Sequence, residues 1–298
     1  MPVLLLALVV AAVVASTAAG AAESPTVVAR IKVAPTAAPC AAAGGGGFVW
    51  VSEYGQPFLL RINPRTDKVV SRVRIGLGSC GLAFGAGSLW VEDTSSSTVS
   101  RVSVTTHKRV AIKVGLTPYD ATFAYGAAWA TAYGDGELDR IDPARNRVVK
   151  RIPLPAATGV VAAFGSIWAT GSVGVIRVDP TTNAVVARIP LQNAGWTAAS
   201  TDAVWITSPQ GLVRIDPASN QIAATVPFGG VPLGDPAIVG GHVWVPRIRQ
   251  NTVALVDPAT NRATASIKVG TGPFVVTEIA GEAWVPSWKG ADIWRLRP

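Results

Sequence analysis

Short apolar runs, separated by turn-forming residues, recur along the whole chain. One recurring run has a tryptophan at its centre and an apolar residue on each side, as in Val49-Trp50-Val51. Since neighbouring side chains of a strand point to opposite faces, apolar residues at every position predict a strand that is buried on both faces. Such a strand needs a further layer on each side. The pattern therefore predicts a molecule built from stacked sheets.

The tryptophan run recurs seven times at intervals of 37 to 40 residues, which is the length of one four-stranded propeller blade. A small apolar run precedes it, and two further runs follow, as in residues 175–190, so each repeat predicts four strands. One blade cannot bury both of its faces, so seven repeats must stack in a ring. We assign the central tryptophans to the core between blades, with a sugar-stacking platform as the alternative: Trp50, Trp90, Trp129, Trp168, Trp205, Trp244 and Trp284.

The two ends of the chain complete each other. The last repeat stops at Pro298 after its third predicted strand, and residues 27–33 match the fourth strand of another repeat, residues 185–189. We therefore predict an all-β fold in which residues 23–298 form one seven-bladed β-propeller of four-stranded antiparallel blades. The N-terminal strand joins the C-terminal blade, and this closure removes exposed strand edges.

Turn residues connect the third and fourth predicted strands. The sequence Arg-Val-Asp-Pro-Thr-Thr-Asn at residues 177–183 has close copies in other repeats. Asp accepts hydrogen bonds from amides two residues on, Pro presets φ, and the final Asn tolerates a left-handed conformation. We interpret these recurring Asp and Asn residues as turn residues, without a catalytic or metal-binding role.

The net charge of +8 does not indicate a nucleic-acid groove. Many of the arginines occupy one position of the repeat, so their charge is distributed around the ring, and no cluster of interleaved aromatic and basic residues is present. We expect no nucleic-acid partner. Attraction to an acidic cell wall or membrane surface stays open.

The first 22 residues carry no charged side chain. An apolar run is followed by small residues with an A-x-A-like site near residues 19–21. This pattern predicts a signal peptide over residues 1–22 and a secreted, periplasmic or cell-envelope location. An uncleaved anchor is the alternative, because about 20 apolar residues can span a bilayer. We expect no membrane span in the mature chain, which we predict to be a monomer.

The tryptophan strands and the Arg-Ile-Asp-Pro-x-Thr-Asn turns together resemble the YVTN-type and virginiamycin B lyase-like propellers of bacteria, over essentially the whole mature chain. Streptogramin lyases of this group are eliminases that use His and Glu residues at the channel mouth with a magnesium ion. The resemblance places that His ten residues before a tryptophan and the Glu three residues after one. Three residues after the tryptophan, the first two repeats have the acidic residues Glu53 and Asp93, but the sixth repeat has Arg247. The first position holds no histidine: Cys40, Cys80, Tyr119, Thr158, Gly195, Gly234 and Phe274.

The two histidines of the chain fall elsewhere in the repeat. His107 occupies the position of the final turn Asn, and His242 begins a tryptophan strand. We interpret both as structural, and we expect no lyase activity.

Loops at one face of a propeller surround its channel, and here their charge is uneven. The first three repeats supply acidic residues and tyrosines, whereas the sixth and seventh supply basic residues and a tryptophan. We predict a polarised rim, with Glu53 and Asp93 facing solvent, that binds a small polar or peptidic ligand. Ordinary solvated loop charge is the alternative. The candidate residues are Glu53, Tyr54, Glu92, Asp93, Tyr119, Asp120, Tyr133, Asp135, Arg247, Arg249, Trp288 and Lys289.

Two classes of function follow from this rim. The first is an exported, non-catalytic propeller that binds a small molecule or a cell-envelope protein, or serves as an envelope scaffold. The second is a lyase-like enzyme, or one acting on a lactone or ester, with a divalent metal at the acidic half. We expect no cofactor and assign no catalytic or metal-binding residue. A quinone-dependent dehydrogenase is disfavoured, because the chain has no adjacent cysteine pair.

The only two cysteines, Cys40 and Cys80, occupy equivalent positions in consecutive repeats. Equivalent positions at the start of neighbouring innermost strands lie side by side at the channel rim, and export allows thiols to oxidise. We predict a disulfide bond, with two free cysteines packed as small apolar residues as the alternative.

Overall fold

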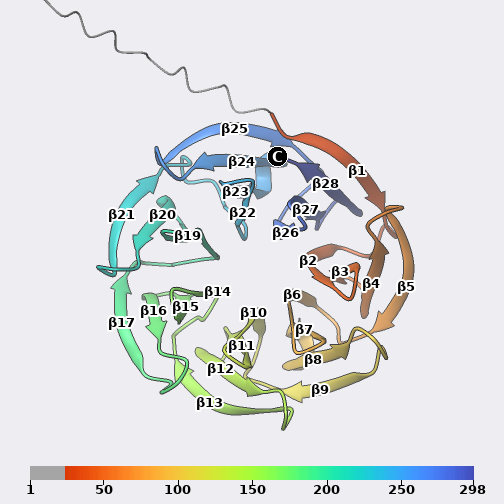
Figure 1. Cartoon of the computed structure of the whole chain (residues 1–298), viewed down its shortest axis with the longest axis horizontal. Helices are drawn as coiled ribbons and strands as arrows, with labels where there is room; N and C mark the ends of the chain where they lie inside the picture. Colours follow the sequence, from red (N-terminus) through yellow and green to blue (C-terminus); the bar gives the residue numbers. More distant parts are fainter. Residues whose placement is uncertain (1–23) are drawn as a thin grey trace, which may run out of the picture.

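The structure is a computed structural model that describes residues 24–298 and shows seven four-stranded sheets arranged around a central channel (Figure 1). Neighbouring strands in each sheet are antiparallel, and sequential strands run from the channel outward. The predicted seven-bladed propeller is confirmed. The signal peptide predicted over residues 1–22 lies outside the described residues. Residues 24–298 contain no helix with the length and apolarity needed to cross a membrane.

Each of the first six blades is one continuous segment of four strands. Blades one to three contain β2 (Pro39–Gly45), β3 (Phe48–Glu53), β4 (Phe58–Asn63) and β5 (Lys68–Arg74); β6 (Ser79–Gly85), β7 (Ser88–Asp93), β8 (Thr98–Ser103) and β9 (Arg109–Lys113); and β10 (Pro118–Ala124), β11 (Ala127–Ala132), β12 (Glu137–Asp142) and β13 (Arg147–Pro153). Blades four to six contain β14 (Val160–Ala163), β15 (Ser166–Gly171), β16 (Gly174–Val178) and β17 (Val185–Pro190); β18 (Thr197–Ala199), β19 (Val204–Ser208), β20 (Gly211–Asp216) and β21 (Gln221–Val226); and β22 (Ala237–Val239), β23 (His242–Arg247), β24 (Thr252–Asp257) and β25 (Arg262–Lys268).

The seventh blade combines both ends of the chain. It consists of β26 (Thr277–Ile279), β27 (Glu282–Ser287), β28 (Asp292–Arg297) and the N-terminal β1 (Thr26–Lys32). β1 pairs antiparallel with β28, from Thr26 opposite Arg297 to Lys32 opposite Asp292, and forms the outer edge of the blade (Figure 1). The predicted closure is confirmed. The helical content of the described residues is limited to two 3₁₀ turns, η1 (Thr94–Ser96) and η2 (Ile248–Gln250).

The core consists of seven hydrophobic clusters, one between each pair of neighbouring blades. The seven periodic tryptophans are buried in these clusters, as their flanking apolar residues predict. Most of their indole N–H groups donate to the turn at the start of the same strand, as Trp50 does to the carbonyl of Gly45 at 3.0 Å. This bond satisfies the one polar atom of a buried indole. The periodic tryptophans are therefore structural.

The repeated arginines link one blade to the next. Arg177 of the fourth blade lies over the ring of Trp168 and donates to the carbonyl of Pro217 and to Oδ1 of Asn220 in the turn of the fifth blade. Arg101 and Arg295 make both corresponding bonds, Arg140 makes the one to Asn183, and Arg295 joins the seventh blade to the first. The turn Asn or Asp residues are thus acceptors for the neighbouring blade. We call this contact the arginine clasp.

Candidate functional site

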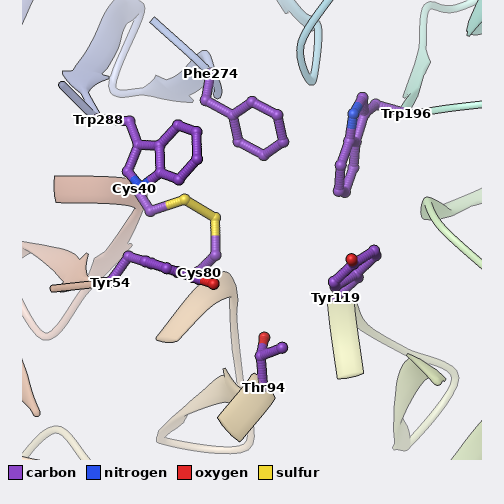
Figure 2. A pocket seen from close by; sticks show the side chains of 8 residues that line it. All are labelled: Cys40, Tyr54, Cys80, Thr94, Tyr119, Trp196, Phe274 and Trp288. Carbon is purple, nitrogen blue, oxygen red and sulfur yellow. A yellow bond between two sulfur atoms is a disulfide. The ribbon is translucent and has the colours of Figure 1, made fainter. Parts of the chain in front are cut away.

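Aromatic side chains outside the repeat pattern gather at one end of the channel. They border a cavity of about 210 Å³ whose lining also includes the two cysteines and Thr94 (Figure 2). We call the five aromatic residues the aromatic mouth: Tyr54, Tyr119, Trp196, Phe274 and Trp288. Their rings are partly exposed, unlike those of the periodic tryptophans. The cavity is therefore an accessible apolar site on an otherwise well-packed ring.

The rings of the aromatic mouth contact one another around the cavity. Tyr54 and Trp288 are 5.7 Å apart between centroids, and Trp288 is 6.1 Å from Phe274. Phe274 lies 5.0 Å from Trp196, which is 6.3 Å from Tyr119. These separations fall in the range of favourable aromatic pairs, so each ring helps to hold its neighbour in place. Figure 2 shows Trp196 and Tyr119 facing the disulfide from the opposite side of the cavity.

Four different blades supply these rings, from two places in the repeat. Tyr119 begins the innermost strand β10, and Phe274 and Trp196 lie just before the innermost strands β26 and β18. Tyr54 and Trp288 follow the tryptophan strands β3 and β27. Both places lie at the same end of the ring because neighbouring strands are antiparallel.

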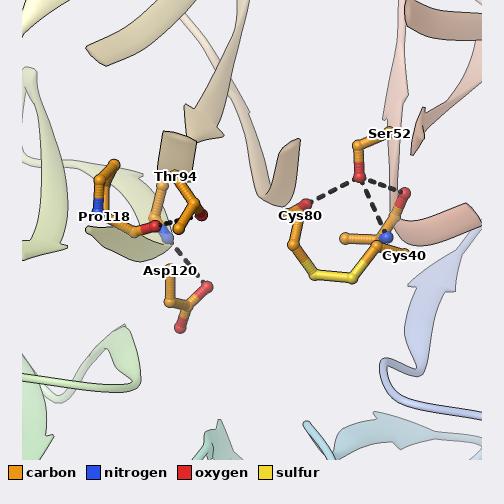
Figure 3. The surroundings of a disulfide bond; sticks show 8 residues. Cys40, Ser52, Cys80, Thr94, Pro118 and Asp120 are labelled. Carbon is orange, nitrogen blue, oxygen red and sulfur yellow. Dashed lines mark hydrogen bonds between the residues drawn. A yellow bond between two sulfur atoms is a disulfide. The ribbon is translucent and has the colours of Figure 1, made fainter. Parts of the chain in front are cut away.

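A disulfide bond between Cys40 and Cys80 forms one wall of the cavity. The two Cα atoms are 5.0 Å apart, within the range that a disulfide requires. The hydroxyl of Ser52 accepts a bond from the amide of Ala41 and donates to the carbonyl of Cys80 at 2.8 Å (Figure 3). The bridge and this hydroxyl therefore join the innermost strands of blades one and two at the channel rim.

Below the aromatic mouth the channel continues as a second cavity of about 180 Å³, whose lining includes the carboxyl groups of Asp120, Asp235 and the exposed Glu278. Asp120 accepts bonds from the amides of Ala121 and Val160, both at 2.8 Å. Burial raises the pKa of Asp120 to about 7, although these amide bonds act to lower it. Asp235, at the equivalent position of the sixth blade, has a pKa raised well above its usual value by burial and by the charge of Asp120, and its Oδ1 has no hydrogen-bond partner.

Glu92 is fully buried beside these carboxylates, and neither of its oxygens has a hydrogen-bond partner. The equivalent residues of blades one, three, four and five are Ser52, Thr131, Thr170 and Thr207, whose hydroxyls bond the innermost strand of their own blade. Burial raises the pKa of Glu92 well above its usual value, and the charges of Asp120, Asp93 and Asp139 raise it further. The folded structure therefore favours the protonated form of Glu92.

The prediction that Glu53 and Asp93 face solvent is wrong, because both are buried. Asp93 ends β7 and accepts bonds from the hydroxyl of Ser79 at 2.7 Å, the amide of Gly76 at 3.1 Å and the guanidinium of Arg109 at 3.2 Å. Ser79 and Arg109 belong to its own blade and Gly76 to the segment that leads into it, so Asp93 holds the strand ends together. Burial raises the pKa of Glu53, although the charge of Arg72 lowers it.

The remaining candidate residues lie at the edge of the site or outside it. Tyr133 packs on Tyr119 at 5.0 Å, and Asp135 accepts a bond from the amide of Leu116. Lys289 is exposed, and its ammonium lies 5.8 Å from the ring of Trp288. Arg249 is exposed, whereas Arg247 borders a different hollow near β25. The structure thus gathers Tyr54, Tyr119, Asp120 and Trp288 around the channel; a ligand role for any candidate stays a prediction.

The predicted set lacks Trp196, Phe274 and Asp235, among other residues of this site. Trp196 lies outside the tryptophan period, and Phe274 occupies the position ten residues before a tryptophan. Both features could have pointed to them. Asp235 follows Gly234 in a proline-containing segment, and only its equivalence to Asp120 could have singled it out.

The residues present do not fit a magnesium site of the lyase type. Of the seven positions ten residues before a tryptophan, Cys40, Cys80, Tyr119 and Phe274 line the cavity, and none is a histidine. Within residues 24–298, no group of three or more His, Cys, Asp or Glu side chains is arranged to hold a metal ion. His107 has a left-handed backbone, with φ of 59°, like Asn183 at the equivalent turn position, which agrees with its structural interpretation.

This arrangement favours binding of a small ligand with an apolar or planar group. Its upper part offers ring faces and few free polar atoms, and its lower part offers carboxylates. Asp120, with a pKa of about 7, can gain or lose a proton near neutral pH.

Comparisons with known proteins bear on the fold. A family described as "Repeat of unknown function (DUF6923)" matches residues 83–211. No curated protein matches the sequence. Similar solved structures include a streptogramin B lyase, at 13% identity and a TM-score of 0.79, which covers 90% of this chain and 96% of its own.

Two further structures share the fold. Hydrazine synthase of Kuenenia stuttgartiensis has 16% identity and a TM-score of 0.75, with coverage of 89% of this chain and 97% of its own. BamB from Moraxella catarrhalis has 10% identity and a TM-score of 0.67, with coverage of 92% of this chain and 100% of its own. The predicted resemblance to streptogramin lyase-like propellers is confirmed for the fold. Since the fold occurs in named enzymes and in BamB, it does not by itself assign an activity.

Proposed function

We propose that this protein is an exported binding protein that takes up a small ligand at the aromatic mouth of its channel. The observation that carries the proposal is the gathering of five partly exposed aromatic rings from four blades around one cavity. Exposed aromatic side chains that converge on a concave site are typical of ligand pockets. The predicted signal peptide and the disulfide support export. A cell-envelope protein that inserts one side chain into the cavity is an equivalent occupant.

The size of the cavity limits the ligand. Pockets for drug-sized molecules usually measure about 300–1,000 Å³, whereas the aromatic mouth encloses about 210 Å³. It therefore holds a single ring, a short head group or one side chain of a larger partner.

Calorimetric titration of the purified chain with p-cresol, indole, glucose and choline tests the proposal. We expect at least one probe to bind, and Trp196→Leu and Phe274→Leu to weaken that binding about tenfold or more. Tyr125→Asn is the matched control, because Tyr125 is an exposed aromatic residue in the turn at the other end of β10 and its left-handed backbone suits Asn. Binding that is absent, or insensitive to both mouth variants, would contradict the proposal.

A second candidate is an enzyme that acts on a small ester or lactone. Asp120 favours it, because a channel carboxyl with a pKa of about 7 is suited to general acid–base catalysis. Assays of p-nitrophenyl acetate and a γ-lactone with and without magnesium would support this candidate only if Asp120→Asn abolishes the turnover.

A further inference from the structure

The rings of the aromatic mouth are arranged as the sides of a box. Tyr54 and Trp288 are nearly perpendicular, with an interplanar angle of 88°, and Trp196 and Phe274 meet at 81°. In such pairs the electron-rich face of one ring meets the edge of the other, so the rings turn in different directions around the cavity. A space bordered by several ring faces attracts a cation, most strongly when the cation is desolvated.

The carboxyl groups of Asp120 and Asp235 lie below the box without a cation of residues 24–298 in contact, and a bound cation would favour their ionised form. Asp120 and Asp235 both line the second cavity, which shares Cys80, Tyr119, Trp196 and Phe274 with the aromatic mouth. Among the described residues, neither carboxylate forms an ion pair, and each is bonded by backbone amides. A positive ligand placed above them would offset their mutual repulsion.

Other ligand classes fit this lining less well. A sugar needs several hydrogen-bond donors and acceptors beside its stacking face, but the Thr94 hydroxyl is committed to the carbonyl of Pro118 at 2.7 Å (Figure 3). An anion would lie against the channel carboxylates. An alkylated ammonium group needs no hydrogen bonds, and it gains from both the ring faces and the carboxylates.

Building on the proposed function, we propose that the ligand carries an alkylated ammonium group, which sits within the aromatic mouth and above Asp120 and Asp235. Lys289 already shows that the ring of Trp288 accepts a cation, since its ammonium lies 5.8 Å from the ring centroid. The net charge of +8 does not oppose this binding at physiological salt, where charges more than about 8 Å away through solvent are largely screened.

Calorimetric titration at pH 8 with choline and with its neutral isostere 3,3-dimethyl-1-butanol tests this inference, because the two differ in charge and hardly in shape. We expect choline to bind at least tenfold more tightly. Trp196→Leu and the double variant Asp120→Asn/Asp235→Asn should each weaken choline binding about tenfold. Asparagine keeps one of the two amide bonds of Asp120, because only its Oδ1 can accept, so thermal unfolding checks that each variant is folded.

Glu278→Gln is the matched control, since Glu278 also lines the second cavity but is exposed and bonded to the amide of Gly281. This variant should leave the affinity for choline unchanged. The inference would be overturned if the neutral isostere bound as tightly as choline. It would also be overturned if neither Trp196→Leu nor the double variant Asp120→Asn/Asp235→Asn weakened choline binding. The proposed function would stay intact in both cases. Failure of choline together with p-cresol, indole and glucose would overturn both.

Discussion

At the scale of single residues, Glu92 is the side chain whose environment departs most from the repeat. Its equivalents in four blades are hydroxyl residues that satisfy backbone groups of the innermost strands. Glu92 instead places two unpartnered oxygens in a fully buried position. A buried polar group without a partner is destabilising by about 1–3 kcal/mol, and a charged carboxylate is more so. The burial of Glu92 therefore favours its protonated form in the folded structure.

Replacing Glu92 by glutamine should stabilise the protein by about 1–3 kcal/mol at pH 7.5. The pKa of Glu92 is higher in the folded chain than its ordinary value of 4.5, so the folded state binds more protons between these two values. Stability from this group therefore falls as the pH rises above about 4.5, and Asp120 acts in the same direction up to about pH 7. Urea unfolding at pH 5 and pH 7.5 measures both effects.

The gain from Glu92→Gln should be largest at pH 7.5 and small near pH 5. Glu278→Gln, an exposed carboxyl of the same channel, should show no such pH dependence. A Glu92→Gln variant that is less stable than the parent chain at pH 7.5 would show that Glu92 has a bonding partner and is not an uncompensated carboxyl.

At the scale of strands and turns, the arginine clasp explains why one arginine recurs in the third strand of most blades. Arg177 bonds two acceptors in the turn of the next blade. Arg61 faces a turn in which His107 replaces the usual Asn, and its Nε has no partner. Its guanidinium instead lies 3.4 Å from the centroid of the Phe48 ring.

Arg177→Met should therefore destabilise the protein by about 1–3 kcal/mol, whereas Arg61→Met should have less effect, because hydrogen bonds to charged groups contribute about 1.5–3 kcal/mol each. Methionine keeps the apolar stem that covers the periodic tryptophan in both variants. Thermal unfolding at neutral pH compares them. If both variants lost the same stability, the hydrogen bonds of the arginine clasp would contribute nothing beyond the packing of the arginine's apolar stem on the tryptophan.

Sequence periodicity was sufficient to predict the strands, the blades and the ring closure, because Trp168 and its equivalents all occupy the same environment. It was not sufficient for the ends of the tryptophan strands. Glu53, Glu92 and Asp93 have the composition of loop residues, yet β3 and β7 extend to include them. Trp196 and Phe274 come together only because the ring curves, and a pattern confined to one repeat does not contain that curvature.

At the scale of the whole molecule, the disulfide joins one of the blade interfaces at which the clasp is incomplete. Cys40 and Cys80 link blades one and two, and these are the blades between which Arg61 lacks its Asn acceptor. The two cysteines are 40 residues apart in the sequence, and on the chain-entropy model a disulfide that closes a loop of this length stabilises the fold by up to about 4 kcal/mol. The covalent bond therefore strengthens the same interface that supports one wall of the cavity.

The double variant Cys40→Ala/Cys80→Ala should lose up to about 4 kcal/mol of stability, and a reducing agent should destabilise only the parent chain. Alanine replaces both cysteines without adding a polar group. Thiol titration of the denatured, unreduced protein gives an independent check, with no free thiol expected. Two free thiols per chain, or equal sensitivity of both proteins to the reducing agent, would contradict the assignment.

The central claim is that the aromatic mouth is the ligand site of this propeller. Soaking crystals with the choline, p-cresol, indole and glucose probes tests it most directly, because the position of a bound probe is then seen. We expect density for at least one probe in the cavity bordered by Trp196, Phe274 and Trp288, against the disulfide. Probes that occupy other surfaces while this cavity stays free of them would contradict it.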